Sequence, residues 1–108
     1  MRGFIGEFEE LVMLTIAYLG SDAYGVSIKE DIEQRASRPV SIGSLHSTIM
    51  RLEEKGFVDS KIGEPTQERG GRRKRYFSVT KTGTAALGNI KNLRDELWAG
   101  SKINLSTQ

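Results

Sequence analysis

The clearest chemistry in this sequence lies in a run of basic residues in its second half. The run comprises Arg69, Gly70, Gly71, Arg72, Arg73, Lys74 and Arg75. So many cationic side chains are not expected in a core, because each would need a buried partner. Two interpretations stay open from the charge alone: an ordinary solvated surface, or a clamp for the phosphates of a nucleic acid.

Two short apolar stretches, residues 57–62 and 76–79, flank this run and predict a β-hairpin. Val58, Ser60 and Ile62 alternate as in a half-buried strand, and Phe77 can return to the same core. Pro65 and the glycine pair predict turns between the two strands. The basic run therefore belongs to the tip of a hairpin.

A predicted helix at residues 43–55 comes immediately before the hairpin. Leu45, Ile49 and Leu52 form one apolar stripe, Ser41 or Ser44 can cap the start, and a glycine follows the end. The residues expected on the other face are Ser44, His46, Ser47, Thr48, Met50 and Arg51. Short polar side chains allow a helix to approach base edges closely. A helix followed by a basic hairpin is the outline of a winged helix, which favours the phosphate clamp.

Within this outline each candidate DNA contact has an expected role. Ser47 and Arg51 are expected nearest the base edges, with Ser44, His46 and Thr48 beside them. The phosphates are expected to be contacted by four residues of the hairpin, Arg69, Arg72, Arg73 and Lys74. Tyr24 is a further candidate, because it begins a predicted helix and its hydroxyl can reach a phosphate; the alternative is a ring in the core with only its tip exposed.

Three more helices and a minor strand complete the expected fold. Helices are predicted at residues 7–19, at 23–35 with Asp22 as the cap, and at 81–99 with Thr80 as the cap. Residues 40–42 are short enough for a third, minor strand. The predicted class is mainly α with a small β-hairpin (α+β): a winged helix-turn-helix with an N-terminal helix and a C-terminal dimerisation helix.

The last predicted helix carries an apolar stripe that calls for a partner. Its members are Ala86, Ile90, Leu93 and Leu97, with Trp98 beside them. The partner is either the first helix of the same chain or a second copy, and Phe8 of that first helix is a further expected dimerisation residue. We expect a DNA-binding domain at residues 1–80, a dimerisation helix at 81–100 and a disordered tail at 101–108.

Composition excludes several other functions. The chain has no cysteine and one histidine, so a metal site or a catalytic triad has few candidate residues. His46 and Ser44 point to different sides of a helix, and the glycine pair lacks the Gly-Lys-Ser/Thr ending of a phosphate-binding loop. Residues 37–80 hold nine basic and five acidic side chains, whereas the whole chain has a net charge of only +2. We expect no enzyme, no cofactor, no metal, no membrane span and a cytoplasmic location.

Several short motifs in order resemble the PadR-type transcriptional regulators. They are Glu7-Phe8-Glu9, Ala23-Tyr24-Gly25-Val26, Gly43-Ser44-Leu45-His46, Arg51-Leu52-Glu53-Glu54-Lys55-Gly56 and the run from Arg69 to Tyr76. The resemblance implies a homodimer joined through the C-terminal helix, which acts as a repressor on a pseudo-palindromic operator in double-stranded DNA. Some relatives release DNA when a flat aromatic effector binds between subunits, a role for which Trp98 is the candidate here; the alternative is that Trp98 only packs in the dimer. His46 stands where the family usually has tyrosine.

These observations predict a sequence-specific, homodimeric DNA-binding repressor that a small aromatic effector can release. The alternative is a winged-helix module that binds a protein and uses its basic hairpin on an acidic partner. Salt-sensitive binding to duplex DNA separates the two.

Overall fold

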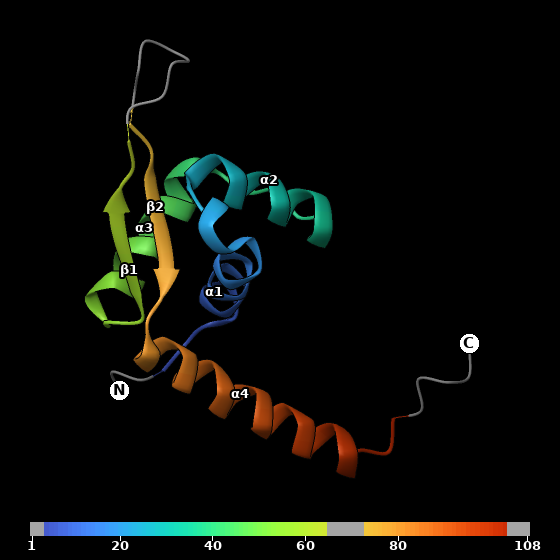
Figure 1. Cartoon of the computed structure of the whole chain (residues 1–108). Coiled ribbons are helices and arrows are strands. Elements are labelled where there is room, and N and C mark those ends of the chain that lie inside the picture. Colours follow the sequence, from blue (N-terminus) through green and yellow to red (C-terminus); the bar gives the residue numbers. More distant parts are fainter. Residues whose placement is uncertain (1–3, 65–72, 104–108) are drawn as a thin grey trace.

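Four helices and one β-hairpin follow one another along the described part of the chain (Figure 1). The computed structural model describes residues 4–64 and 73–103. Its elements are α1 (Glu7–Leu19), the short 3-10 turn η1 (Gly20–Asp22), α2 (Gly25–Ala36), α3 (Ile42–Glu54), β1 (Val58–Ile62), β2 (Arg75–Val79) and α4 (Lys81–Gly100). The predicted α+β winged-helix architecture is confirmed. Residues 104–108 of the predicted tail lie outside the described residues.

Local capping explains where α3 and α4 begin. The Ser41 hydroxyl accepts a hydrogen bond from the Ser44 backbone N–H at 3.1 Å, and the Thr80 hydroxyl accepts one from Gly83 N–H at 3.0 Å. Each bond satisfies a donor that the first helical turn leaves without a partner. Gly56, with φ of 79°, follows α3 in the left-handed conformation that stops a helix. Of the two caps considered for α3, Ser41 is therefore the one used.

The start of α2 differs from the prediction. Asp22 is not its cap, because Asp22 ends η1 and α2 begins only at Gly25. Tyr24 has an extended backbone, and its N–H donates to the Ser27 hydroxyl at 3.0 Å. Residues 23–24 are extended because they pair with β2, as described next.

The hairpin is joined by an isolated β-bridge to the segment before α2. β1 and β2 are antiparallel, with Val58 opposite Val79 and Ile62 opposite Arg75. On the far side of β2, Phe77 N–H donates to the Ala23 carbonyl at 2.9 Å, and Tyr24 forms a bridge with Tyr76. The prediction of a minor strand at residues 40–42 is wrong, because Ser41 caps α3 and Ile42 is its first residue.

A single core joins α1, α2, α3 and the hairpin. Its largest fully buried hydrophobic side chains are Val12, Met13, Ile16, Ile28, Ile32, Leu45, Leu52 and Val58. Gly83 brings the start of α4 against this core, since a Cβ at that position would overlap the carbonyl oxygen of Phe57. The core therefore fixes α3 and the hairpin relative to each other.

The C-terminal half of α4 leaves the core (Figure 1). Ala86 and Ile90 are half-buried against the core of their own chain. Further along, Leu93, Leu97 and Trp98 are 55%, 63% and 52% exposed. No helix in the described part of the chain is long and apolar enough to cross a membrane.

Candidate nucleic-acid interface

The exposed face of α3 is the centre of the candidate interface. Ser44, His46 and Ser47 are exposed and lie in the N-terminal half of the helix, which begins at the Ser41 cap. The expectation that Thr48 shares this face is wrong, because its side chain is only 1% exposed. Thr48 lies three residues after Leu45 and four before Leu52, so it belongs to the buried stripe.

The turn between α2 and α3 is held by one carboxylate. Glu33 accepts a hydrogen bond from Val40 N–H at 3.0 Å and pairs with Lys29 at 3.0 Å. The Val40 N–H, and then Lys29, lower the pKa of Glu33 below its ordinary value. Ser37 ends α2 with a left-handed φ of 51°. These contacts hold the turn between α2 and α3, and so they help to fix the orientation of α3 relative to α2.

The β1–β2 hairpin is the wing of this fold, and its base brings a cation and two aromatic rings together. Lys74 Nζ lies 4.1 Å from the centre of the Tyr24 ring, and this ring meets Tyr76 edge to face at 5.7 Å between centroids. Tyr24 is half-buried, so its ring packs between the wing and α2. Arg75 donates to Ser60 across the hairpin at 2.7 Å. The wing thus presents Lys74 from a braced position.

Only the C-terminal end of the predicted basic run, from Arg73 onward, lies within the described residues. Arg73 is exposed, next to Lys74. Arg69 and Arg72 lie outside the described residues. The basic side chains whose positions are known therefore sit where the wing returns to β2, beside the exposed face of α3.

A cavity of about 580 Å³ is lined by residues of β2, of α3 and of the start of α2. It brings together three predicted site residues, Tyr24, His46 and Lys74. Its lining also includes three residues that were absent from the predicted DNA contacts: Val26, Ile42 and Met50. They are apolar, so they carry no charge or hydrogen-bonding group that would indicate a contact with DNA. The sequence signal that could have found them is spacing, because Ile42 and Met50 flank His46 along one helix.

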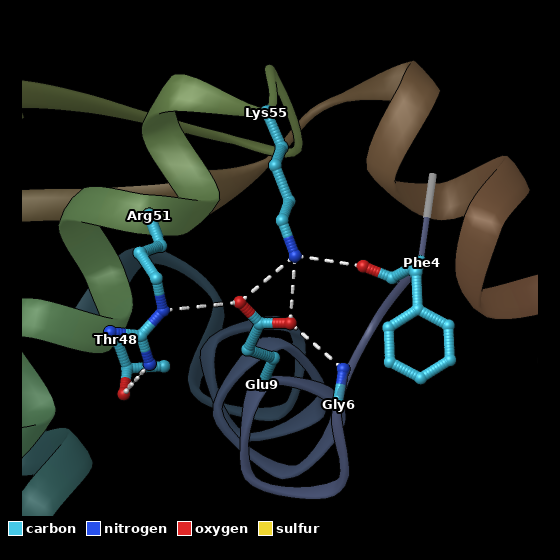
Figure 2. Close-up of polar contacts among 6 residues, drawn as sticks. All are labelled: Phe4, Gly6, Glu9, Thr48, Arg51 and Lys55. Carbon is cyan, nitrogen blue, oxygen red and sulfur yellow. Dashed lines mark hydrogen bonds and ion pairs between the residues drawn. The ribbon is translucent and has the colours of Figure 1, made fainter. Parts of the chain in front are cut away.

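On the opposite flank of α3, a buried carboxylate of α1 holds two cations (Figure 2). Lys55 Nζ lies 2.9 and 3.0 Å from the two Glu9 oxygens and 2.7 Å from the Phe4 carbonyl oxygen. Gly6 N–H donates to Glu9 at 2.8 Å, and Arg51 Nε is 3.5 Å from the same carboxylate. Burial alone would raise the pKa of Glu9, but Gly6 N–H, Lys55 and Arg51 together hold that pKa below its ordinary value.

This cluster also decides where Arg51 points. Its Nη2 donates to the Thr48 hydroxyl at 3.2 Å, while Nε faces Glu9, so the guanidinium is turned toward α1 (Figure 2). The side chain remains 55% exposed. Arg51 and His46 consequently lie on different flanks of α3, with the exposed Ser47 on the surface between them.

The predicted dimerisation residues fall into two groups. Phe8, Ala86 and Ile90 are half-buried in their own chain, and the Arg38 guanidinium lies 4.8 Å from the centre of the Phe8 ring. Leu93, Leu97 and Trp98 form the exposed group. Arg94 anchors the middle of α4 to α1 through a 2.9 Å ion pair with Glu10.

Residues 4–64 and 73–103 contain no candidate metal site. No group of three or more His, Asp or Glu side chains there is placed to hold a metal ion. The arrangement offers hydrogen-bond donors and acceptors, cations and apolar side chains.

Comparison with known proteins identifies relatives of the same architecture. The model of the "Transcriptional regulator PadR-like family" matches residues 13–89. A PadR-like transcription factor from Bacteroides fragilis is 25% identical with a TM-score of 0.72, over 85% of this chain and 84% of that one. No curated protein matches the sequence.

Two further solved structures have the same fold. A PadR family transcription regulator from Clostridium difficile R20291 is 18% identical, with a TM-score of 0.69 over 85% of this chain and 92% of that one. RosR of H. salinarum is 22% identical, with a TM-score of 0.61 over 93% of this chain and 81% of that one.

Proposed function

The chain belongs to the PadR-like family of DNA-binding transcriptional regulators, and from this premise we propose that it is a homodimeric, sequence-specific repressor. The observation that carries the proposal is that α3 and the wing expose polar and cationic side chains next to each other. His46 of α3 and Lys74 of the wing line the same cavity, Ser47 is exposed next to His46, and Arg73 is exposed next to Lys74. Hydrogen-bonding side chains next to cations match the base edges and phosphates of one major groove.

Within this proposal the residues divide by the part of DNA that they contact. His46 and Ser47 face base edges, because they are exposed in the N-terminal half of α3. Ser44 points to another side of the helix, beside Phe8 and Arg38, and contacts the flank of the site. Lys74, Arg73 and Tyr24 hold the flanking backbone, together with Arg69 and Arg72 of the same basic run. Arg51 contacts the edge of the site rather than its centre, because its guanidinium is shared with Glu9 and Thr48.

The exposed apolar end of α4 supports dimerisation through this helix. Leu93, Leu97 and Trp98 are all more than half exposed, and a second copy is a partner that could cover them. Pairing with a second α4 would bury them and place two copies of α3 on one operator. We assign residues 1–80 to DNA binding and residues 81–100 to dimerisation on this basis.

Release by a small aromatic effector is part of the same proposal. The cavity beside Trp98 measures about 180 Å³ in one chain and is lined by Arg94, Leu97 and Ile103. Ligand pockets usually span about 300–1,000 Å³, so an effector site here would need the second copy to complete it. Quenching of Trp98 fluorescence by a planar aromatic dye, with loss of DNA binding at the same dye concentration, is the expected result. A dye that quenches without releasing DNA would contradict effector control.

The decisive experiment measures DNA binding directly. Duplexes enriched from a random library by the full chain should bind more tightly than unselected duplexes, and both affinities should fall steeply with salt. Failure to bind any duplex at low salt would overturn the proposal. It would favour the alternative that the basic wing docks on an acidic protein.

A further inference from the structure

Three apolar side chains meet in the cavity between α3 and the wing. Val26 belongs to the first turn of α2, Ile42 opens α3, and Met50 lies two turns further along α3. They are 52%, 56% and 48% exposed, so they are not part of the core. Single apolar residues on a surface are ordinary, but three exposed ones that line the same cavity call for an explanation.

The charged groups around this cavity limit what can occupy it. Lys74 and Arg75 border it on the β2 side, and His46 lies between the two apolar residues of α3. This rim attracts a polyanion. Glu53 also lines the cavity, and its carboxylate disfavours a phosphate at that end. The occupant therefore has phosphates at the rim and uncharged, partly apolar groups in the middle.

The major groove of DNA matches this description at one base. Thymine carries a 5-methyl group there, the apolar feature that distinguishes it from the other three bases. We propose that Val26, Ile42 and Met50 form a thymine-methyl sensor, so that each operator half-site presents thymine where α3 meets the wing. This inference rests on the proposed function, and it names the base and the group that the apolar residues recognise.

The test removes the methyl group from the DNA and leaves base pairing unchanged. Duplexes enriched from a random library are resynthesised with deoxyuridine in place of thymidine, one half-site position at a time. The wild-type chain should bind about fourfold less tightly for each contacted methyl that is removed, the factor expected for one buried apolar carbon. Positions away from the sensor should show no difference.

Variants of the chain assign the effect to the cavity. Met50→Gln keeps side-chain length, and Ile42→Thr removes one carbon and adds a hydroxyl. In both variants the ratio of thymidine to deoxyuridine affinity should fall toward one. Leu14→Gln is the matched control, since Leu14 is 49% exposed on α1 and does not line the cavity. Its ratio should equal that of the wild type, and circular dichroism checks that all three variants fold.

Each outcome has a distinct meaning. Selective binding of enriched duplexes with equal affinity for thymidine and deoxyuridine overturns the methyl sensor but leaves the proposed function intact. A ratio that survives in both cavity variants also overturns it. If no duplex is enriched, the proposed function fails and the sensor with it. Binding of an apolar dye that Met50→Gln abolishes, together with a ratio of one, would reassign the cavity to a small molecule.

Discussion

Glu9 is the residue whose chemistry depends most on its neighbours. Its side chain is only 9% exposed, yet it stays charged because Gly6 N–H and Lys55 hold both oxygens. A buried carboxylate with such partners stabilises the fold, since removal of the charge leaves the Lys55 ammonium without its counter-ion. Glu9 therefore links the first turn of α1 to the last turn of α3.

Glu9→Gln should lower the free energy of unfolding by about 1–3 kcal/mol at neutral pH. The folded-state pKa of Glu9 lies below its ordinary value of 4.5, so this stabilisation is fully present above that unfolded value. It is lost as pH falls through the folded value. Urea unfolding at pH 7 and at pH 3 measures the difference between wild type and variant, which should shrink at the lower pH.

Glu30→Gln provides the control for this experiment, because Glu30 is an exposed glutamate of α2 and the charge change is the same. It should change stability by less than about 0.5 kcal/mol. An equal effect of the two variants would mean that net charge, and not the contacts of Glu9, explains the loss.

His46 is the only histidine and lines the cavity at the candidate interface. In the proposed complex its exposed imidazole faces base edges, so it should contribute more to specific than to random binding. His46→Ala should lower the ratio of enriched to random affinity, as fluorescence anisotropy on the two duplexes would reveal. An unchanged ratio would exclude His46 from base recognition.

At the scale of elements, the wing and α3 should make separable contributions to binding. Backbone phosphates carry no base identity, so a wing cation adds affinity for every duplex. Each phosphate contact also contributes a slope of about −0.9 to the dependence of log affinity on log salt. Arg73 is exposed next to the braced Lys74 and is the described arginine best placed for this role.

Arg73→Ala should lower the affinity for enriched and for random duplexes by similar factors. It should also make the slope of log affinity against log salt shallower by roughly one unit. Salt titrations on the two duplexes measure both quantities. Lys102→Ala removes the same charge from an exposed position beyond α4, and it should leave the slope unchanged. A loss confined to the enriched duplex would move Arg73 from backbone contact to base or groove-shape recognition.

At the scale of the whole molecule, the exposed end of α4 should hold the dimer together. Leu93→Glu would place a charge against apolar neighbours, at a cost of several kcal/mol per buried charge, or separate the subunits. Sedimentation at micromolar concentration should then show a monomer. DNA affinity should fall in parallel, because one dimer holds two half-sites.

Asn92→Glu is the matched control for the dimer, since this neighbouring exposed residue lies off the apolar stripe of α4. It should remain a dimer with normal DNA affinity. If Leu93→Glu also sediments as a dimer, α4 is not the interface, and its exposed leucines must have another partner.

Local signals in the sequence predicted the four helices and the hairpin, although they placed the start of α2 wrongly and added a strand at residues 40–42. The Ser41 and Thr80 caps, the glycine after α3 and the apolar stripes depend on residues within one or two turns of each other. Such short-range interactions can be recognised in the sequence because they need no contact with a distant element. The spacing of Leu45 and Leu52 already placed Thr48 on the buried stripe. We predicted it to be exposed because its side chain is polar.

Only the tertiary structure decided which distant residues meet. Glu9 and Lys55 lie 46 positions apart, and residues 23–24 pair with β2 across the chain. Likewise, the cavity exists because α2, α3 and β2 converge around Tyr24 and Ile42. Contacts of this kind depend on how whole elements pack against a shared core, and a local pattern of residue types does not encode that packing. The sequence by itself therefore determined the winged helix, whereas the packing of its elements turned Arg51 toward α1 and gathered the apolar residues beside His46.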